Sequence, residues 1–211
     1  MIKVKLGIQT IDLPYTIQVY GVTEELFDEL VGGDTKAELL DGVMIVHSPA
    51  SLQHEDMASF LGGLMSFYAD AKALGKVIAS GNGVVHLALY RKFASDVFFI
   101  RQERVPMPLP REFEGAPDLV VEVLSPSNRS DDLFARRPAY HAAGVPEIWS
   151  VDIESRRVIV DYKREQGYVE EIITEGRVLS AVLEGFWIHA PWLWTEPLPN
   201  RMFCLQEILQ A

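Results

Sequence analysis

Two carboxylates stand in or beside the most strand-like segments of the sequence. Glu122 lies within Leu-Val-Val-Glu-Val-Leu at 119–124, a run typical of a buried strand, and Asp96 opens a second such segment. A buried, ionised carboxylate is unfavourable unless it is paired or bound to a cation. If the two segments are neighbouring strands, both carboxylates can reach one point, and Mg²⁺ is a cation that favours such a pair. On these two residues alone, the structural interpretation is preferred, in which Asp96 caps a strand and Glu122 pairs with an arginine.

Two further residues strengthen the chemical interpretation. Glu38 has apolar neighbours in a segment, 36–47, that an Asp-Gly pair predicts to be two strands or a hairpin. His54 lies in the first turn of a predicted helix that Ser51 can cap. Alone, His54 is consistent with a helix-start histidine that has no chemical role. Together with the two strand carboxylates, however, these residues indicate a site.

The predicted elements that position these residues are mixed α and β. Apolar residues recur at helical spacing from Met57 to Ala71, and Gly75 ends that helix. Strand-like segments then follow one another, interrupted by a short helix at 136–144. This order predicts an α/β protein with one long helix and a central sheet.

The composition is that of an ordinary globular protein. The chain has 211 residues, of which 48% are hydrophobic and 23% charged, which suits a single domain. No apolar segment is long enough to span a membrane, and a single cysteine, Cys204, excludes an internal disulfide, so we expect a cytoplasmic protein. The net charge of −11 opposes nucleic-acid binding, which would need a local basic patch or a neutralising metal.

The order of five motifs resembles the Uma2 family of the PD-(D/E)XK nuclease superfamily. These motifs are AELLDG, SPASLQH, SDVFFI, GAPDLVVEVLSPSNR and AYHAAGVPEIWSVD, and the resemblance covers roughly residues 20 to 190. It implies a restriction-endonuclease-like core, with a mixed central β-sheet flanked by helices. We expect one domain over 1–211, with an N-terminal extension at 1–35 and an aromatic C-terminal segment at 187–211.

The resemblance also assigns site residues. The superfamily's metal-binding aspartate and glutamate correspond to Asp96 and Glu122, and the implied cofactor is Mg²⁺ or Mn²⁺. Glu38 and His54 match further catalytic positions of the family. Asp118 also matches, but on a regular strand it lies ~13 Å from Glu122, so we expect a supporting role rather than a shared ion.

The superfamily's catalytic lysine is absent from its usual place, where this sequence has Leu124. Related sequences supply a lysine from the following helix, in a spacing that here reads Asp132, Arg136 and Tyr140. Arg136 keeps the positive charge and can stabilise a transition state, but an arginine does not act as a base near neutral pH. Pro138 indicates that this helix begins later than in relatives.

Two functions are consistent with these features. The first is a divalent-metal-dependent DNA endonuclease, expected to be a homodimer because two symmetric sites can cut both strands. The second is a catalytically weak or inactive nuclease-fold domain that binds nucleic acid or protein. The carboxylates favour the first, whereas the missing lysine and the acidity favour the second.

Overall fold

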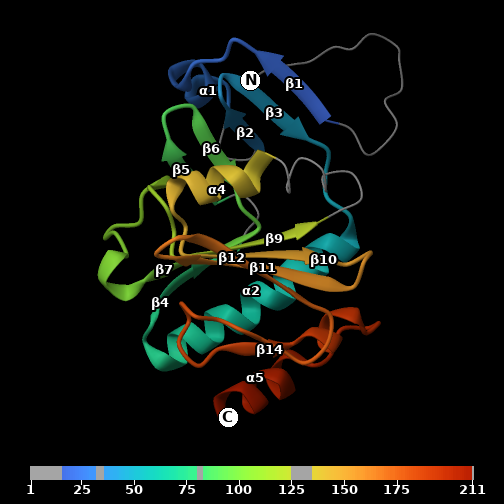
Figure 1. Ribbon diagram of the computed structural model, residues 1–211. Helices are drawn as coiled ribbons and strands as arrows, with labels where there is room; N and C mark the ends of the chain where they lie inside the picture. The colour runs from blue at the N-terminus through green and yellow to red at the C-terminus, as the bar shows by residue number, and fades with distance from the viewer. Residues whose placement is uncertain (1–15, 32–35, 80–82, 125–134, 211) are drawn as a thin grey trace.

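The computed structural model describes residues 16–31, 36–79, 83–124 and 135–210, and it contains two six-stranded sheets (Figure 1). The first sheet has the order β1-β3-β2-β6-β5-β8, with strands at Thr16–Tyr20 (β1), Ala37–Leu40 (β2), Val43–His47 (β3), Val84–Ala88 (β5), Arg91–Ala94 (β6) and Glu112–Glu114 (β8). The second has the order β12-β11-β10-β9-β7-β4, with strands at Gly75–Ile78 (β4), Val97–Arg101 (β7), Leu119–Leu124 (β9), Glu147–Asp152 (β10), Arg157–Arg164 (β11) and Gly167–Ile173 (β12).

The remaining described elements are helices and a small two-stranded sheet. The α-helices are at Glu24–Leu30 (α1), Leu52–Lys72 (α2), Arg137–Ala143 (α4) and Arg201–Gln210 (α5). Short 3₁₀ helices lie at Gln102–Arg104 (η1) and Ala190–Trp194 (η3), and the small sheet pairs Arg177–Leu179 (β13) with Trp187–His189 (β14). Strands β9 and β10 are parallel, whereas the other neighbours in the second sheet are antiparallel. The predicted mixed α/β class is therefore confirmed.

Helix α2 covers one face of the second sheet (Figure 1). Ser51 caps it as predicted, because its Oγ accepts a hydrogen bond from the His54 backbone N–H at 3.2 Å. Its apolar face is buried with the sheet, the small β13–β14 sheet and α5 in the largest core cluster, which includes Phe60, Leu61, Leu64 and Trp149. The cap places His54 in the first turn, beside the point where β7 begins.

Helix α4 lies on the opposite face of the second sheet, between it and the first sheet (Figure 1). The helix spans Arg137–Ala143, with Pro138 in its first turn, and Gly144, whose φ of 80° suits a glycine, caps its C-terminus. Tyr140 is buried against the sheet, and the buried Arg136 immediately precedes the helix. Both side chains are thereby directed into the space between the two sheets.

The predicted hairpin forms β2 and β3, with its turn at Asp41 and Gly42. The pairing sets Glu38 opposite Ile45. Strand β1, which lies in the predicted N-terminal extension, pairs with β3 and is thus part of the first sheet. None of the described helices is long and apolar enough to cross a membrane.

Candidate active site

The pairing of β7 with β9 brings Asp96 and Glu122 together. The register joins Val97 to Val121 and Phe98 to Val120. Asp96 immediately precedes this register and Glu122 immediately follows Val121, so the two carboxylates come from neighbouring positions of paired segments. Because like charges so placed repel, this pair needs compensating cations.

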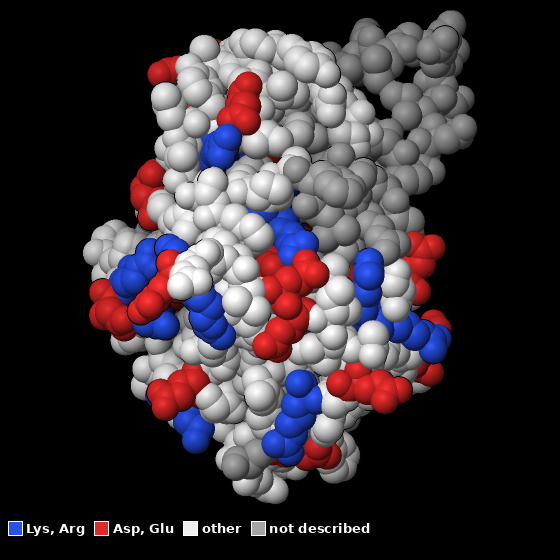
Figure 2. Space-filling model, viewed as in Figure 1, with Lys and Arg blue, Asp and Glu red and all other residues white. Residues whose placement is uncertain are grey.

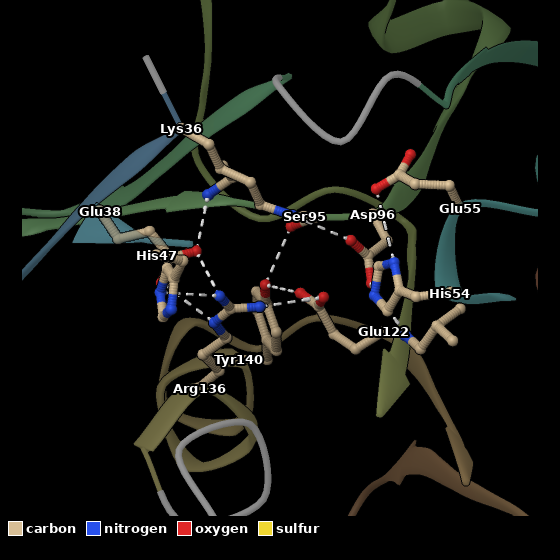
Figure 3. Close-up of polar contacts among 12 residues, drawn as sticks. Lys36, Glu38, His47, His54, Glu55, Ser95, Asp96, Glu122, Arg136 and Tyr140 are labelled. Carbon is tan, nitrogen blue, oxygen red and sulfur yellow. Dashed lines mark hydrogen bonds and ion pairs between the residues drawn. The ribbon is translucent and has the colours of Figure 1, made fainter. Parts of the chain in front are cut away.

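Three groups stabilise the buried Asp96 carboxylate (Figure 3). Lys36 Nζ donates to Oδ1 at 3.2 Å, and the Val123 backbone N–H donates to Oδ2 at 2.9 Å. His54 Nε2 lies 3.1 Å from Oδ2. Burial alone would raise the pKa of Asp96, but the hydrogen bond from His54 and the charge of Lys36 outweigh it and hold this pKa well below its usual value.

Glu122 is held by a tyrosine and an arginine from the α4 region (Figure 3). The Tyr140 hydroxyl donates to Oε1 at 2.5 Å, and Arg136 Nη1 donates to Oε2 at 3.2 Å. Since the Tyr140 proton is directed to Glu122, the Ser95 hydroxyl, 2.9 Å from the Tyr140 oxygen, acts as its donor. Burial and the charge of Glu122 raise the pKa of Tyr140 well above its usual value, so Tyr140 remains a donor.

Glu38 joins the same network from the first sheet. Arg136 binds the Glu38 carboxylate through two nitrogens, with Nη2 2.8 Å from Oε1 and Nε 3.1 Å from Oε2. His47 Nε2 lies 3.2 Å from Oε2, and the Ala94 backbone N–H donates to Oε1 at 3.2 Å. Burial would raise the pKa of Glu38, but Arg136 and then His47 outweigh it and lower this pKa.

Two cationic partners of these carboxylates have shifted pKa values. Burial would lower the pKa of Lys36, but Asp96 in particular outweighs it, so this pKa is raised and Lys36 stays an ammonium. His54 behaves in the same way: Asp96 overcomes the effect of burial and raises its pKa. With His54 protonated, three carboxylates face three positive charges.

The predicted site residues are distributed over two places. Glu38, Glu122 and Arg136 are in direct contact, and Asp96 and His54 contact one another beside them. Asp118 lies at the other end of β9, where Arg104 Nη1 is 2.9 Å from its Oδ2 and the Arg101 backbone N–H donates to the same oxygen at 2.9 Å. Its contacts therefore connect β9 to β7 and η1 and do not involve the site. Asp132 lies outside the described residues.

The sequence interpretation did not include Lys36 or His47 in the site. The hairpin register would have indicated both: Ala37 pairs with Val46, so continuing by one residue sets Lys36 across from His47. Alternation along β2 then places Lys36 and Glu38 on one face. Tyr140 follows Arg136 by four residues, which puts both on the same side of a helix.

A second group of possible metal ligands lies in the first sheet. Among the described residues, His86, Glu112 and Glu114 form the set of three whose ligand atoms lie within 4.8 Å of one another. Lys92 Nζ already lies 3.0 Å from Glu112 Oε1, and Glu24 Oε1 is 2.9 Å from His86 Nε2. Together with Glu24, Asp28 and Lys92, these three residues are called the surface cluster. The core cluster consists of Lys36, Glu38, His54, Asp96, Glu122 and Arg136.

The surface charge does not form a continuous basic band on the side seen in Figure 2, where acidic and basic side chains are interspersed. The net charge of −11 would repel a polyanion at long range. An anionic substrate would therefore depend on cations close to the site.

Comparisons with known proteins identify a family and a similar fold. A family model, Uma2, described as "Putative restriction endonuclease", matches residues 24–191. A crystal structure described as a "putative nuclease" belonging to DUF820, from Anabaena variabilis, has a similar fold, with a TM-score of 0.72 and 16% identity over 82% of this chain and 97% of that one. No curated protein matches the chain in sequence. The predicted nuclease-type fold is confirmed, and because the family model covers most of its length, this chain belongs to the Uma2 family.

Proposed function

We propose that this Uma2 protein is a divalent-metal-dependent DNA endonuclease whose PD-(D/E)XK-type site holds the ion through Asp96 and Glu122. The observation that carries the proposal is that two buried carboxylates lie at neighbouring ends of paired strands, Asp96 just before β7 and Glu122 within β9, where the register pairs Val97 with Val121. Two like charges at neighbouring positions are unfavourable in a purely structural protein. They are suited to a site where a cation and an anionic substrate meet.

The donor chemistry of the site fits Mg²⁺ or Mn²⁺. Magnesium is bound through one or two carboxylates, with waters and phosphate oxygens completing its shell. Asp96 and Glu122 supply two hard oxygen donors, and the lowered pKa of Asp96 keeps that ligand ionised. When bound, the ion would supply positive charge to the phosphate and lower the pKa of a coordinated water.

In this proposal, the residues around Asp96 and Glu122 hold the two carboxylates in position. Tyr140 fixes the rotation of the Glu122 carboxylate, and His54 fixes that of Asp96. Arg136 joins Glu122 to Glu38, so the first sheet is fastened to the second at the site. Ligand orientation of this kind commonly changes metal affinity or activity by ~10–100-fold.

Plasmid nicking tests the proposal. Wild-type protein with Mg²⁺ or Mn²⁺ should nick supercoiled DNA, and Asp96→Asn and Glu122→Gln should lose at least ~10²-fold in rate. Nicking that continues undiminished in both variants would reject the proposed site. Metal binding without cleavage would favour the alternative, a nuclease-fold domain that binds nucleic acid or protein.

We also propose that the enzyme acts as a homodimer, because two symmetric sites can cut both strands of a duplex. Light scattering across micromolar concentrations should give twice the chain mass of 23.7 kDa. The monomer mass throughout that range would contradict this part of the proposal.

A further inference from the structure

The core cluster contains two side chains that are positively charged at neutral pH, Lys36 and Arg136. Arg136 makes more contacts with carboxylates than Lys36 does. Each of the three guanidinium nitrogens of Arg136 faces a carboxylate oxygen of Glu38 or Glu122, at 2.8 to 3.2 Å. Its side chain is only 5% exposed. To reach a phosphate, Arg136 would have to leave two buried carboxylates without their cation, which is strongly unfavourable.

Lys36 is placed differently. Within the described residues it makes one polar side-chain contact, to Asp96 Oδ1 at 3.2 Å, although an ammonium carries three donors. Its side chain is 25% exposed, against 4% for Asp96. Lys36 is thus the more exposed of the two cations, and its ammonium has donor capacity beyond its contact with Asp96.

The contacts of Asp96 leave room for this role. Lys36 approaches Oδ1, whereas His54 and the Val123 N–H approach Oδ2, so the two oxygens have separate partners (Figure 3). A phosphate held beside Asp96 would therefore lie near the Lys36 ammonium without displacing His54.

We infer that Lys36, and not Arg136, is the cation of this chain that contacts the scissile phosphate, and that it replaces the lysine absent at Leu124. The inference rests on the proposed function. In the hydrolysis, a water oxygen bonds to phosphorus and releases one proton to solvent, the bond from phosphorus to the leaving oxygen breaks, and solvent supplies a proton to that leaving oxygen. Lys36 keeps its proton throughout and donates a hydrogen bond to a non-bridging oxygen, while Arg136 is a positioning residue.

The first test compares nicking rates of Lys36→Met and Lys76→Met. Lys76 is an exposed lysine on β4, so its variant carries the same charge change away from the site. We expect Lys36→Met to lose ~10²–10³-fold in rate and Lys76→Met to match the wild type. Lys36→Arg should recover most of the loss, because it restores a charged donor. Equal rates for Lys36→Met and Lys76→Met would overturn the inference.

The second test separates a phosphate contact from simple neutralisation of Asp96, and it does not require cleavage. Binding of a labelled DNA duplex is measured against salt concentration, without metal, for Asp96→Asn and for Asp96→Asn with Lys36→Met. Loss of one phosphate contact should reduce the slope of log K against log salt by ~0.9. An unchanged slope, or no measurable binding by either protein, would overturn the assignment of Lys36.

The two tests keep the two proposals apart. Wild-type nicking that does not depend on Asp96 rejects the endonuclease proposal, whereas the salt slope still decides whether Lys36 contacts phosphate. Conversely, Asp96-dependent nicking with an unaffected Lys36→Met variant rejects Lys36 alone.

Discussion

The core cluster and the surface cluster contain similar residue types in different surroundings. In the core cluster, Glu38, Asp96 and Glu122 are buried, and Lys36, His54 and Arg136 contact them. Each carboxylate oxygen has a named donor. The strands and α4 therefore fold around carboxylates that are paired at fixed geometry.

In the surface cluster, acids outnumber cations. Glu24, Glu112 and Glu114 lie within 4 Å of His86, and Asp28 lies 2.8 Å from Lys92. Four carboxylates thus face two cationic groups. Water screens part of this excess, because the Glu114 and Asp28 side chains are 69% and 49% exposed, although Lys92 itself is buried.

The difference shows what burial demands of a charged group. An exposed carboxylate can remain without a matched cation, whereas a buried one is tolerated only with partners at fixed geometry. The buried strand β9 can carry Glu122 because Arg136 and Tyr140 pair with its carboxylate. The structural interpretation of the sequence therefore holds for Glu122, which pairs with an arginine, whereas the metal-binding interpretation stays a proposal.

Replacing Arg136 should give the largest effect. Arg136→Met leaves Glu38 and Glu122 buried without their shared cation and should reduce the free energy of unfolding by ~3–5 kcal/mol. Urea unfolding measures it. The matched control is Arg91→Met, because Arg91 pairs with an exposed carboxylate, Asp41, at 3.0 Å, and its loss should cost at most ~1 kcal/mol. Equal losses would contradict the distinction between the two clusters.

The next-largest difference between the two clusters should be in metal binding. Calorimetric titration with Mn²⁺ should show binding in the wild type that weakens more than ~10-fold in Glu122→Gln, because a ligand oxygen is lost. His86→Ala removes the nitrogen of the surface cluster and should bind as the wild type does. The reverse pattern would place the ion at His86, Glu112 and Glu114 and remove the support for the proposed site.

The pH dependence of stability should be dominated by the core cluster. Glu38 and Asp96 have lowered pKa values, so the stability they contribute is present above the unfolded value near 4 and is lost as the pH falls through the lower folded values. His54 has a raised pKa, so its contribution is complete below the unfolded value near 6.5 and is lost as the pH rises through the higher folded value. Unfolding free energies measured from pH 5 to 9 should fall on the alkaline side in the wild type and less in His54→Gln. An equal fall in His54→Gln would assign that pH dependence to other groups.

Local sequence signals predicted the elements of the site better than its contacts. The Asp-Gly turn gave the hairpin, Ser51 gave the start of α2, and Gly144 gave the end of α4. Each of these signals acts over a few residues, through a cap or a positive φ angle. The family resemblance then pointed to Asp96 and Glu122, although their metal-binding role stays a proposal.

The partners of these residues depend on contacts between distant segments. Arg136 meets Glu38 across 98 positions, and Lys36 meets Asp96 across 60. The sequence also gave no signal that β5, β6 and β8 would join the hairpin in a separate sheet. Such pairings are decided by the packing of the whole chain, which composition and periodicity do not encode. The family resemblance did place Arg136 near the site, but it did not indicate the ion pair between Arg136 and Glu38.

The smallest effect should come from the surface cluster, and it completes the comparison. Glu114→Gln removes a charge 3.0 Å from His86 Nδ1, but the exposed carboxylate is already well solvated, and Glu24 still faces the other ring nitrogen. The expected loss is within ~0.5 kcal/mol and should shrink further in 0.5 M salt, since exposed charges are screened. Glu122→Gln makes the same chemical change in the core, where it removes a charged acceptor from Arg136 and Tyr140, so it should cost ~1–3 kcal/mol with little dependence on salt. Paired urea unfolding curves at low and high salt measure both. If Glu114→Gln were the more damaging of the two, burial would not be what separates the clusters, and the surface cluster would have to hold a structural role of its own.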